Sequence, residues 1–89
     1  MRPYPHEVAV LRLFASARDA AGTGRDRVPG GTVAEVLQAA RERYGERFTA
    51  VLADSRVWVN GDPVPDDTAV TDEDEVAVLP PVSGGAGPV

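Results

Sequence analysis

Residues Glu75-Val76-Ala77-Val78-Leu79-Pro80-Pro81-Val82-Ser83-Gly84-Gly85 join a strand-forming run to a segment that cannot continue a sheet. Proline lacks the amide hydrogen that a sheet ladder needs, so the double proline ends the strand and favours an extended exit. The diglycine that follows adds backbone freedom and almost no width. We therefore expect a folded domain, residues 1–81, and a flexible, thin C-terminal tail, residues 82–89. The alternative is a frayed Gly/Pro terminus without function.

The other strongly apolar segment is Val8–Phe14, which is interrupted only by Arg12. It predicts a strand that is buried on both faces. Residues 20–24 contain two glycines and predict a turn, after which residues 25–28 predict a short partner strand. These two strands are expected to form a hairpin.

The clearest helix is predicted for Val33–Tyr44. Thr32 and Glu35 have the spacing of a capping box, in which a hydroxyl and a carboxylate satisfy the first amides of a helix. Apolar residues recur at helical spacing on one face of this segment, and Gly45 is placed for a C-cap. Further apolar residues between positions 48 and 52 suggest a second, shorter helical turn.

The remaining strands follow this helical region. Val57–Val59 predicts a strand that ends at Asn60-Gly61, a strong hairpin signal, with a brief return strand at Val64. The order of elements allows a mixed sheet of about five strands with one face packed on the main helix. Because the first and last strands are the most apolar, we expect them to lie side by side and parallel at its centre. This α+β arrangement is the ubiquitin-like β-grasp fold.

Charge and composition exclude several classes of function. The 89 residues carry a net charge of −5, all nine basic residues are arginine, and none lies beyond Arg56. Seven acidic residues fall between Asp62 and Glu75, which form either a solvated face or a surface attracted to a basic partner. This balance argues against nucleic-acid binding. No apolar run reaches the ~20 residues of a membrane span and no signal peptide is evident, so we expect a soluble cytoplasmic protein.

Side chains that carry out catalysis are sparse. His6 is the only histidine and cysteine is absent, which leaves no His-centred triad and no zinc pair. The aspartates do not follow the spacing of a calcium loop, so we expect neither a metal site nor a bound cofactor. Phe48 and Trp58 are more typical of core residues than of a ligand platform. The remaining reactive group is a C-terminal glycine carboxylate, which is unhindered and can be activated by adenylation.

Three segments resemble the MoaD/ThiS family of small sulfur carriers, in particular the small subunit of molybdopterin synthase. They are Leu13–Asp19, Val59–Gly61 and Asp74–Gly85, of which the last is the most specific. The resemblance extends from about Val8 to Gly85. It implies a β-grasp carrier that is not itself an enzyme.

The resemblance also implies partners and site residues. In the family, a ubiquitin-activating-like adenylyltransferase uses ATP to adenylate the terminal glycine, and sulfur transfer then forms a thiocarboxylate. The tail enters the large subunit of molybdopterin synthase, where sulfur passes to a pterin precursor in molybdenum cofactor biosynthesis. Gly85 would carry the thiocarboxylate. The residues that would enter the partner are Pro81, Val82, Ser83 and Gly84. Phe14, Arg18 and Leu79 would contact the partner, the alternatives being core positions for Phe14 and Leu79 and solvent for Arg18.

The sequence departs from the family pattern after Gly85. Molybdopterin-type members normally end at the second glycine, whereas Ala86-Gly87-Pro88-Val89 follows here, so Gly85 lacks a free carboxylate. Removal by a processing protease, a fusion remnant and loss of carrier function are the competing explanations, and we favour processing. Other acceptors (in thiamine, cysteine or sulfur-containing natural product synthesis), a ubiquitin-like protein modifier and a plain interaction module remain alternatives.

Overall fold

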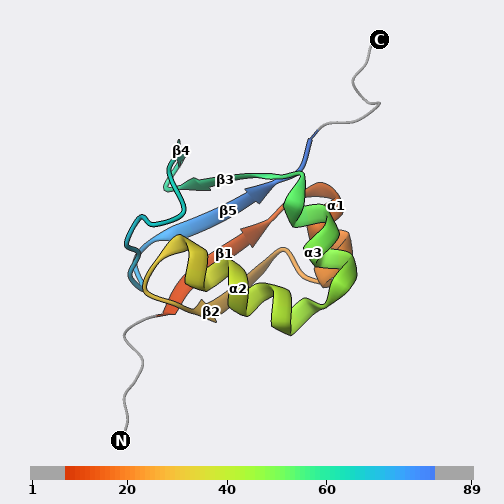
Figure 1. Ribbon diagram of the computed structural model, residues 1–89, viewed down its shortest axis with the longest axis horizontal. Coiled ribbons are helices and arrows are strands. Elements are labelled where there is room, and N and C mark those ends of the chain that lie inside the picture. The colour runs from red at the N-terminus through yellow and green to blue at the C-terminus, as the bar shows by residue number, and fades with distance from the viewer. Residues whose placement is uncertain (1–7, 82–89) are drawn as a thin grey trace, which may run out of the picture.

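The two most apolar strands lie together at the centre of a five-stranded sheet in the computed structural model, which describes residues 8–81 (Figure 1). The elements in chain order are β1 (Val8–Leu13), α1 (Ala15–Ala21), β2 (Arg25–Pro29), α2 (Val33–Tyr44), α3 (Glu46–Ala53), β3 (Arg56–Val59), β4 (Asp62–Pro63) and β5 (Glu75–Leu79). The strands are ordered β2-β1-β5-β3-β4. Only the β1–β5 pair is parallel. The predicted β-grasp fold with its central parallel pair is therefore confirmed.

The connection between β1 and β2 differs from the prediction. β1 ends at Leu13, and Ala15–Ala21 forms a helix, so the predicted strand ran one residue too long and the predicted hairpin contains α1. Alanine favours helix, Ala17 is fully buried, and Gly22 adopts the left-handed conformation that ends a helix (φ +82°). β1 and β2 nevertheless pair antiparallel, as expected.

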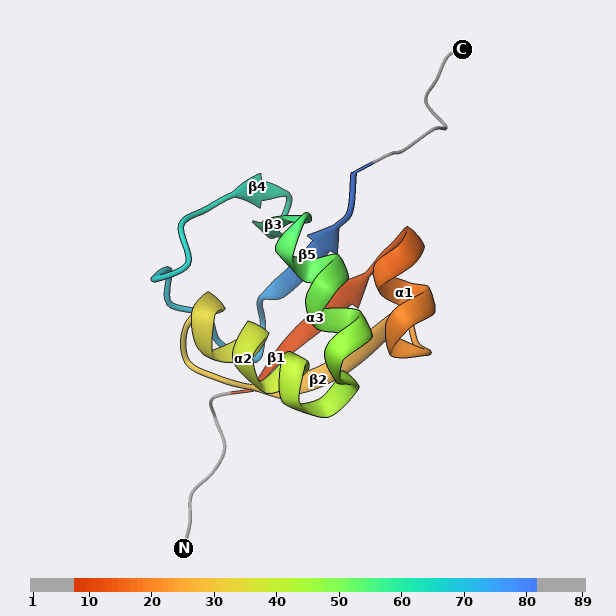
Figure 2. The same ribbon diagram turned by 45° about the vertical axis from the view of Figure 1, so that its right-hand side comes forward.

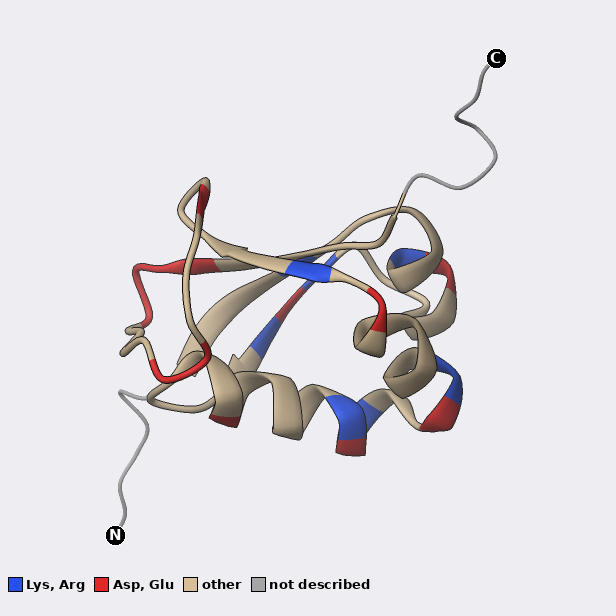
Figure 3. Cartoon of the chain, turned by 45° about the horizontal axis from the view of Figure 1, so that its top comes forward, with Lys and Arg blue, Asp and Glu red and all other residues tan. Residues whose placement is uncertain are grey.

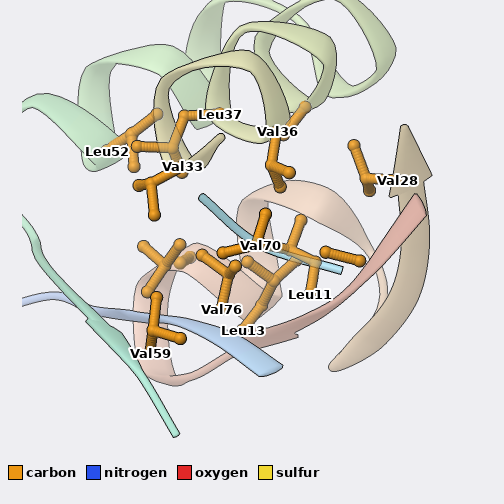
Figure 4. Packing of buried hydrophobic residues seen from close by; sticks show 14 of the residues in the cluster. Leu11, Leu13, Val28, Val33, Val36, Leu37, Leu52, Val59, Val70 and Val76 are labelled. Carbon is orange, nitrogen blue, oxygen red and sulfur yellow. The ribbon is translucent and has the colours of Figure 1, made fainter. Parts of the chain in front are cut away.

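The hydrophobic core lies between one face of the sheet and the helices (Figure 4). Alternate residues of the central strands face it, because side chains in a strand point to opposite faces in turn. These residues are Ala9, Leu11, Leu13, Val76 and Val78. The facing residues of α2 are Val33, Val36, Leu37 and Ala40. Phe48 is fully buried as predicted, and burial of one such side chain contributes about 1.5–3 kcal/mol.

Two smaller sequence-based expectations for the second half of the sheet are corrected. Trp58 is half-buried and lies outside the core cluster, because Val57 and Val59 occupy the alternate positions that face the helices. The short return strand is Asp62–Pro63, and Val64 follows it, half-buried against the core. The turn between β3 and β4 has the expected positive φ at both central residues, +52° at Asn60 and +91° at Gly61.

The first turn of α2 is capped by its own residues and by the distant loop before β5. The amide of Glu35 donates to Thr32 Oγ1 (3.2 Å), which confirms the predicted cap, while the Glu35 carboxylate accepts from Gly31 N (2.7 Å). The first two amides of the helix are bound by the loop instead. Val33 N donates to the carbonyl oxygen of residue 68 (3.0 Å), and Ala34 N donates to that of residue 66 (2.8 Å). The loop 64–70 therefore satisfies helix-end donors that no local residue reaches.

The backbone at Gly30 passes so close to α2 that only glycine fits. Its φ is +149°, and a Cβ there would lie 2.6 Å from Val36 N. We expect Gly30→Ala to lower the free energy of unfolding by about 2 kcal/mol or more, because overpacking adds to the conformational cost. Gly22→Ala is the matched control. Gly22 also has a positive φ (+82°), but a Cβ there would meet no atom within 4 Å, so the free energy of unfolding should fall by only about 1 kcal/mol. Urea unfolding measures both values, and equal losses would contradict the close-approach explanation.

The carboxyl end of α2 is tied to β2 through the Asp26 carboxylate. It accepts hydrogen bonds from the Tyr44 hydroxyl and from Arg43 Nη1 (2.9 Å), and Arg43 Nη1 also donates to the Arg27 carbonyl (2.8 Å). The hydrogen bond from Tyr44 is the main reason that the pKa of Asp26 is lowered. Burial, followed by the hydrogen bond to Asp26, raises the pKa of Tyr44 to about 12.

This shift predicts a stability change at alkaline pH. The folded pKa of Tyr44 lies above its unfolded value of about 10, so its contribution to stability is complete below pH ~10 and is lost as the pH rises towards about 12. Urea unfolding between pH 8 and pH 12 should therefore show a decline in the free energy of unfolding that is smaller in Tyr44→Phe. An identical decline in both proteins would contradict a shifted Tyr44.

Candidate functional site

The carboxyl ends of β1 and β5 meet at one end of the domain, because these strands are parallel. Leu13 pairs with Val78, so Phe14 and Leu79 leave the sheet side by side. α1 begins immediately after Phe14, and Figures 1 and 2 both place it next to the end of β5. The structure thus brings together Phe14, Arg18 and Leu79, which are far apart in the sequence.

Phe14 is held in place by its backbone while its ring remains exposed. Its carbonyl accepts from the amides of Ala17 and Arg18 at 3.0 and 3.3 Å, which fixes it as the N-cap of α1. The side chain is 38% exposed, and no other large hydrophobic side chain within residues 8–81 is exposed. The guanidinium carbon of Arg12 lies 5.5 Å from the ring centroid, a cation–π distance. Phe14 is therefore a surface residue and not a core residue.

Leu79 and the two prolines form the point at which the chain leaves the sheet. Leu79 is half-buried on the face opposite the helices, where it pairs with Arg56 of β3. Pro80 is half-buried and Pro81 is exposed. A groove of about 320 Å³ lies beside this exit, lined by Ser16, Ala50, Val51, Asp54, Pro80 and Pro81. The predicted tail residues Val82, Ser83, Gly84 and Gly85, and the extension Ala86-Gly87-Pro88-Val89, lie outside the described residues.

A larger hollow of about 490 Å³ opens between the end of β1, the start of α1 and the start of β2. We call it the arginine cleft. Its lining consists of Arg12, Leu13, Phe14, Ala15, Arg18, Thr23, Gly24 and Arg25. The position that a Cβ on Gly24 would take is 3.5 Å from Arg18 Cδ and Nε, so the Arg18 side chain passes over the Gly24 backbone. Ala15 has a φ of +51°, a strained value for alanine, where the chain turns from β1 into α1.

Sequence reasoning identified Arg18 but missed the two arginines that share its cleft. Arg12 lies opposite Arg25 in the antiparallel β1–β2 pair, and both side chains alternate with residues of the core face. Alternation along β1 alone could have placed Arg12 on the outer face. The proximity of Arg25 depends on the strand register, which no local pattern specifies.

The described residues offer neither a metal centre nor a membrane span. Within residues 8–81, no group of three or more His, Cys, Asp or Glu side chains is placed to hold a metal ion. No helix in the same range is long and apolar enough to cross a membrane. The distinctive features of this part of the chain are the exit at Pro80-Pro81 and the arginine cleft next to it.

Solved structures with the same fold include proteins described as a modifier and as a subunit of a molybdopterin converting factor. Small archaeal modifier protein 1 from Methanosarcina acetivorans shares 28% identity at a TM-score of 0.78, over 88% of this chain and 96% of that one. A candidate molybdopterin converting factor, subunit 1, from Pyrococcus furiosus shares 29% identity at a TM-score of 0.73. This match covers 84% of the present chain and 98% of the Pyrococcus chain. A chain of the Amycolatopsis orientalis BexX/CysO complex matches at 21% identity and a TM-score of 0.70, over 86% and 99%, which supports the fold alone.

The sequence itself also matches a family model. The ThiS family model covers residues 11–85, from the middle of β1 to the second glycine of the Gly84-Gly85 pair. This range contains the whole sheet except the start of β1, together with all three helices. The chain therefore belongs to the ThiS family, whose members are ubiquitin-like sulfur carriers and modifiers.

Proposed function

We propose that this chain is a sulfur carrier that serves as the small subunit of molybdopterin synthase in the cytoplasm. The observation that carries the proposal is the position of the tail exit. The parallel β1–β5 pair releases the chain at Pro80-Pro81, next to an exposed aromatic residue, and the family match ends at Gly85. The reactive group would be the Gly85 carboxylate, once a processing protease has removed residues 86–89.

In this proposal, the chain supplies an acyl group, and partner enzymes supply the catalysis. The Gly85 carboxylate attacks the α-phosphate of ATP in the active site of an adenylyltransferase, and pyrophosphate leaves. Hydrosulfide from a sulfur donor then attacks the Gly85 carbonyl carbon, AMP leaves, and a thiocarboxylate remains. In the large subunit its sulfur passes to a pterin precursor, and water returns the Gly85 carbon to a carboxylate. ATP belongs to the activating partner, and we propose that the chain itself binds no cofactor.

The length of the tail suits this division of labour. The six residues from Pro80 to Gly85 span at most about 20 Å when extended. That reach is enough to carry the Gly85 carbonyl into a buried active site while the domain stays outside. Pro81, Val82, Ser83 and Gly84 would occupy the entrance channel, which a glycine next to the reactive residue keeps narrow.

The partner would recognise the domain at the surface around the exit. Phe14 is supported as a contact residue by its exposure, and Leu79 and Arg18 by their positions beside it. The likeness to the candidate converting factor subunit of Pyrococcus furiosus favours the molybdopterin acceptor. The run Leu79-Pro80-Pro81-Val82-Ser83 favours it as well. Carriers for thiamine, cysteine or sulfur-containing natural products would use the same chemistry with another acceptor.

Protein modification is the second candidate function. The likeness to the modifier protein of Methanosarcina acetivorans favours it, because the same activated Gly85 could be attacked by a lysine amine instead of sulfur. Peptides from cell extracts that carry Gly85 on a lysine would identify this use. If such peptides are absent from cells in which the trimmed protein carries a thiocarboxylate, that result would support the sulfur-carrier function over protein modification.

The proposal predicts a mass change in a trimmed protein. Residues 1–85, incubated with the adenylyltransferase, ATP and a sulfur donor, should gain the mass of an oxygen-to-sulfur exchange in intact-mass spectrometry. The full chain of 89 residues should not, because Gly85 is there an internal peptide carbonyl. Omitting ATP is the control for non-enzymatic reaction. Failure of the trimmed protein to gain this mass would refute the carrier function.

A further inference from the structure

Positive and negative charges occupy different parts of this acidic protein. The acidic residues of positions 62–75 lie on β4, the loop that joins β4 to β5, and the start of β5 (Figure 3). The strand residues that alternate with the core face include four arginines and one acid, Glu75. The four arginines are Arg12, Arg25, Arg27 and Arg56. A protein with a net charge of −5 thus presents a basic surface next to its tail exit.

The positive charge is most concentrated in the arginine cleft. Arg12, Arg18 and Arg25 line it, and none of its lining residues is acidic. Arg12 approaches Glu75 at 3.5 Å, but the two side chains are 38% and 46% exposed, so this ion pair is weak and Arg12 can exchange Glu75 for a carboxylate of a ligand. The cleft therefore has three guanidinium groups available to an incoming anion.

The shape and chemistry of the cleft suggest a protein segment as the ligand. Arginine forms two parallel hydrogen bonds with a carboxylate or with a phosphate, so the guanidinium groups select a planar or tetrahedral oxyanion, and the apolar part of the cleft has to distinguish between these ligands. Phe14 adds an exposed ring at the same cleft, and phenylalanine and arginine are both enriched in protein–protein interfaces. A small anion would leave that ring uncovered.

We propose that the arginine cleft binds an acidic segment of a partner protein, with carboxylates paired to Arg12, Arg18 and Arg25 and an apolar side chain covering Phe14. The inference rests on the proposed function, because it assigns the partner that receives the tail. The acidic loop around β4 would face away from that partner and orient the domain as it approaches.

The test is a titration of the isotope-labelled full chain with a short capped peptide built from Glu-Leu-Asp repeats, followed by amide NMR shifts. We expect the largest shifts at residues 12–18 and 23–25, with affinity about tenfold weaker when the salt concentration rises from about 0.05 M to 0.5 M. A peptide with lysine at the acidic positions should produce no shifts there. Sodium sulfate is the small-anion comparison.

Charge-reversal variants give the matched control. Arg12→Glu with Arg25→Glu should weaken peptide binding by about tenfold or more. Arg41→Glu with Arg47→Glu makes the same change of net charge on α2 and α3, outside the cleft, and should leave binding within about twofold. Arg12→Lys with Arg25→Lys keeps the charge and should bind better than the glutamate pair. The dispersion of each spectrum shows whether the variant is folded.

Three outcomes would overturn the inference: no shifts with the acidic peptide, equal weakening by the two charge-reversed pairs, or sulfate reproducing the peptide shifts at equal affinity. None of these measurements uses Gly85. A trimmed chain that gains sulfur but does not bind the peptide would therefore refute the cleft and keep the carrier. A chain that binds the peptide but never gains sulfur would refute the carrier function and keep the binding role of the cleft.

Discussion

The parallel pairing of β1 with β5 is the constraint on which the other features depend. It joins residues more than sixty positions apart, Val10 with Glu75 and Leu13 with Val78, and so can form only after most of the chain has folded back. Once formed, it sets five apolar side chains beneath α2 and closes the core. It also fixes where the chain leaves the sheet. Because both strands point the same way, the exit at Pro80 and the exposed ring of Phe14 lie at the same end of the domain.

Elements with strong local signals were predictable from the sequence, and elements defined by their partners were not. α2 has the predicted bounds because its cap, apolar spacing and following glycine agree. α1 was missed because its seven residues carry one buried side chain, and the nearby glycines suggested a turn. β2 was predicted at residues 25–28 from the turn signal before it and spans Arg25–Pro29, although only Val28 is buried. In Val57-Trp58-Val59 three apolar residues conceal the alternation, so only the register shows that Trp58 faces outward.

The residues of the candidate site also differ in whether the sequence alone could identify them. Phe14, Arg18 and Leu79 came from resemblance to a family, and the fold explains why they can act together, since two strand ends and one helix start converge there. Arg12 and Arg25 carried no motif. Their significance follows from a register that sets them opposite each other and from a helix that places Arg18 above Gly24. Charge counted along the sequence suggested an acidic protein, whereas charge mapped on the fold shows a basic face.

The composition of the tail indicates which part of the chain would distinguish one partner protein from another. Glycine and proline present little side-chain surface, so the segment that would carry the reactive carbonyl can contribute few discriminating contacts. Recognition would then come from side chains of residues 8–81, and those beside the exit belong to Phe14, Leu79, the groove next to Pro80-Pro81 and the arginine cleft. In the proposed carrier, the folded domain would therefore select the partner, and Gly84-Gly85 would present the reactive group to it.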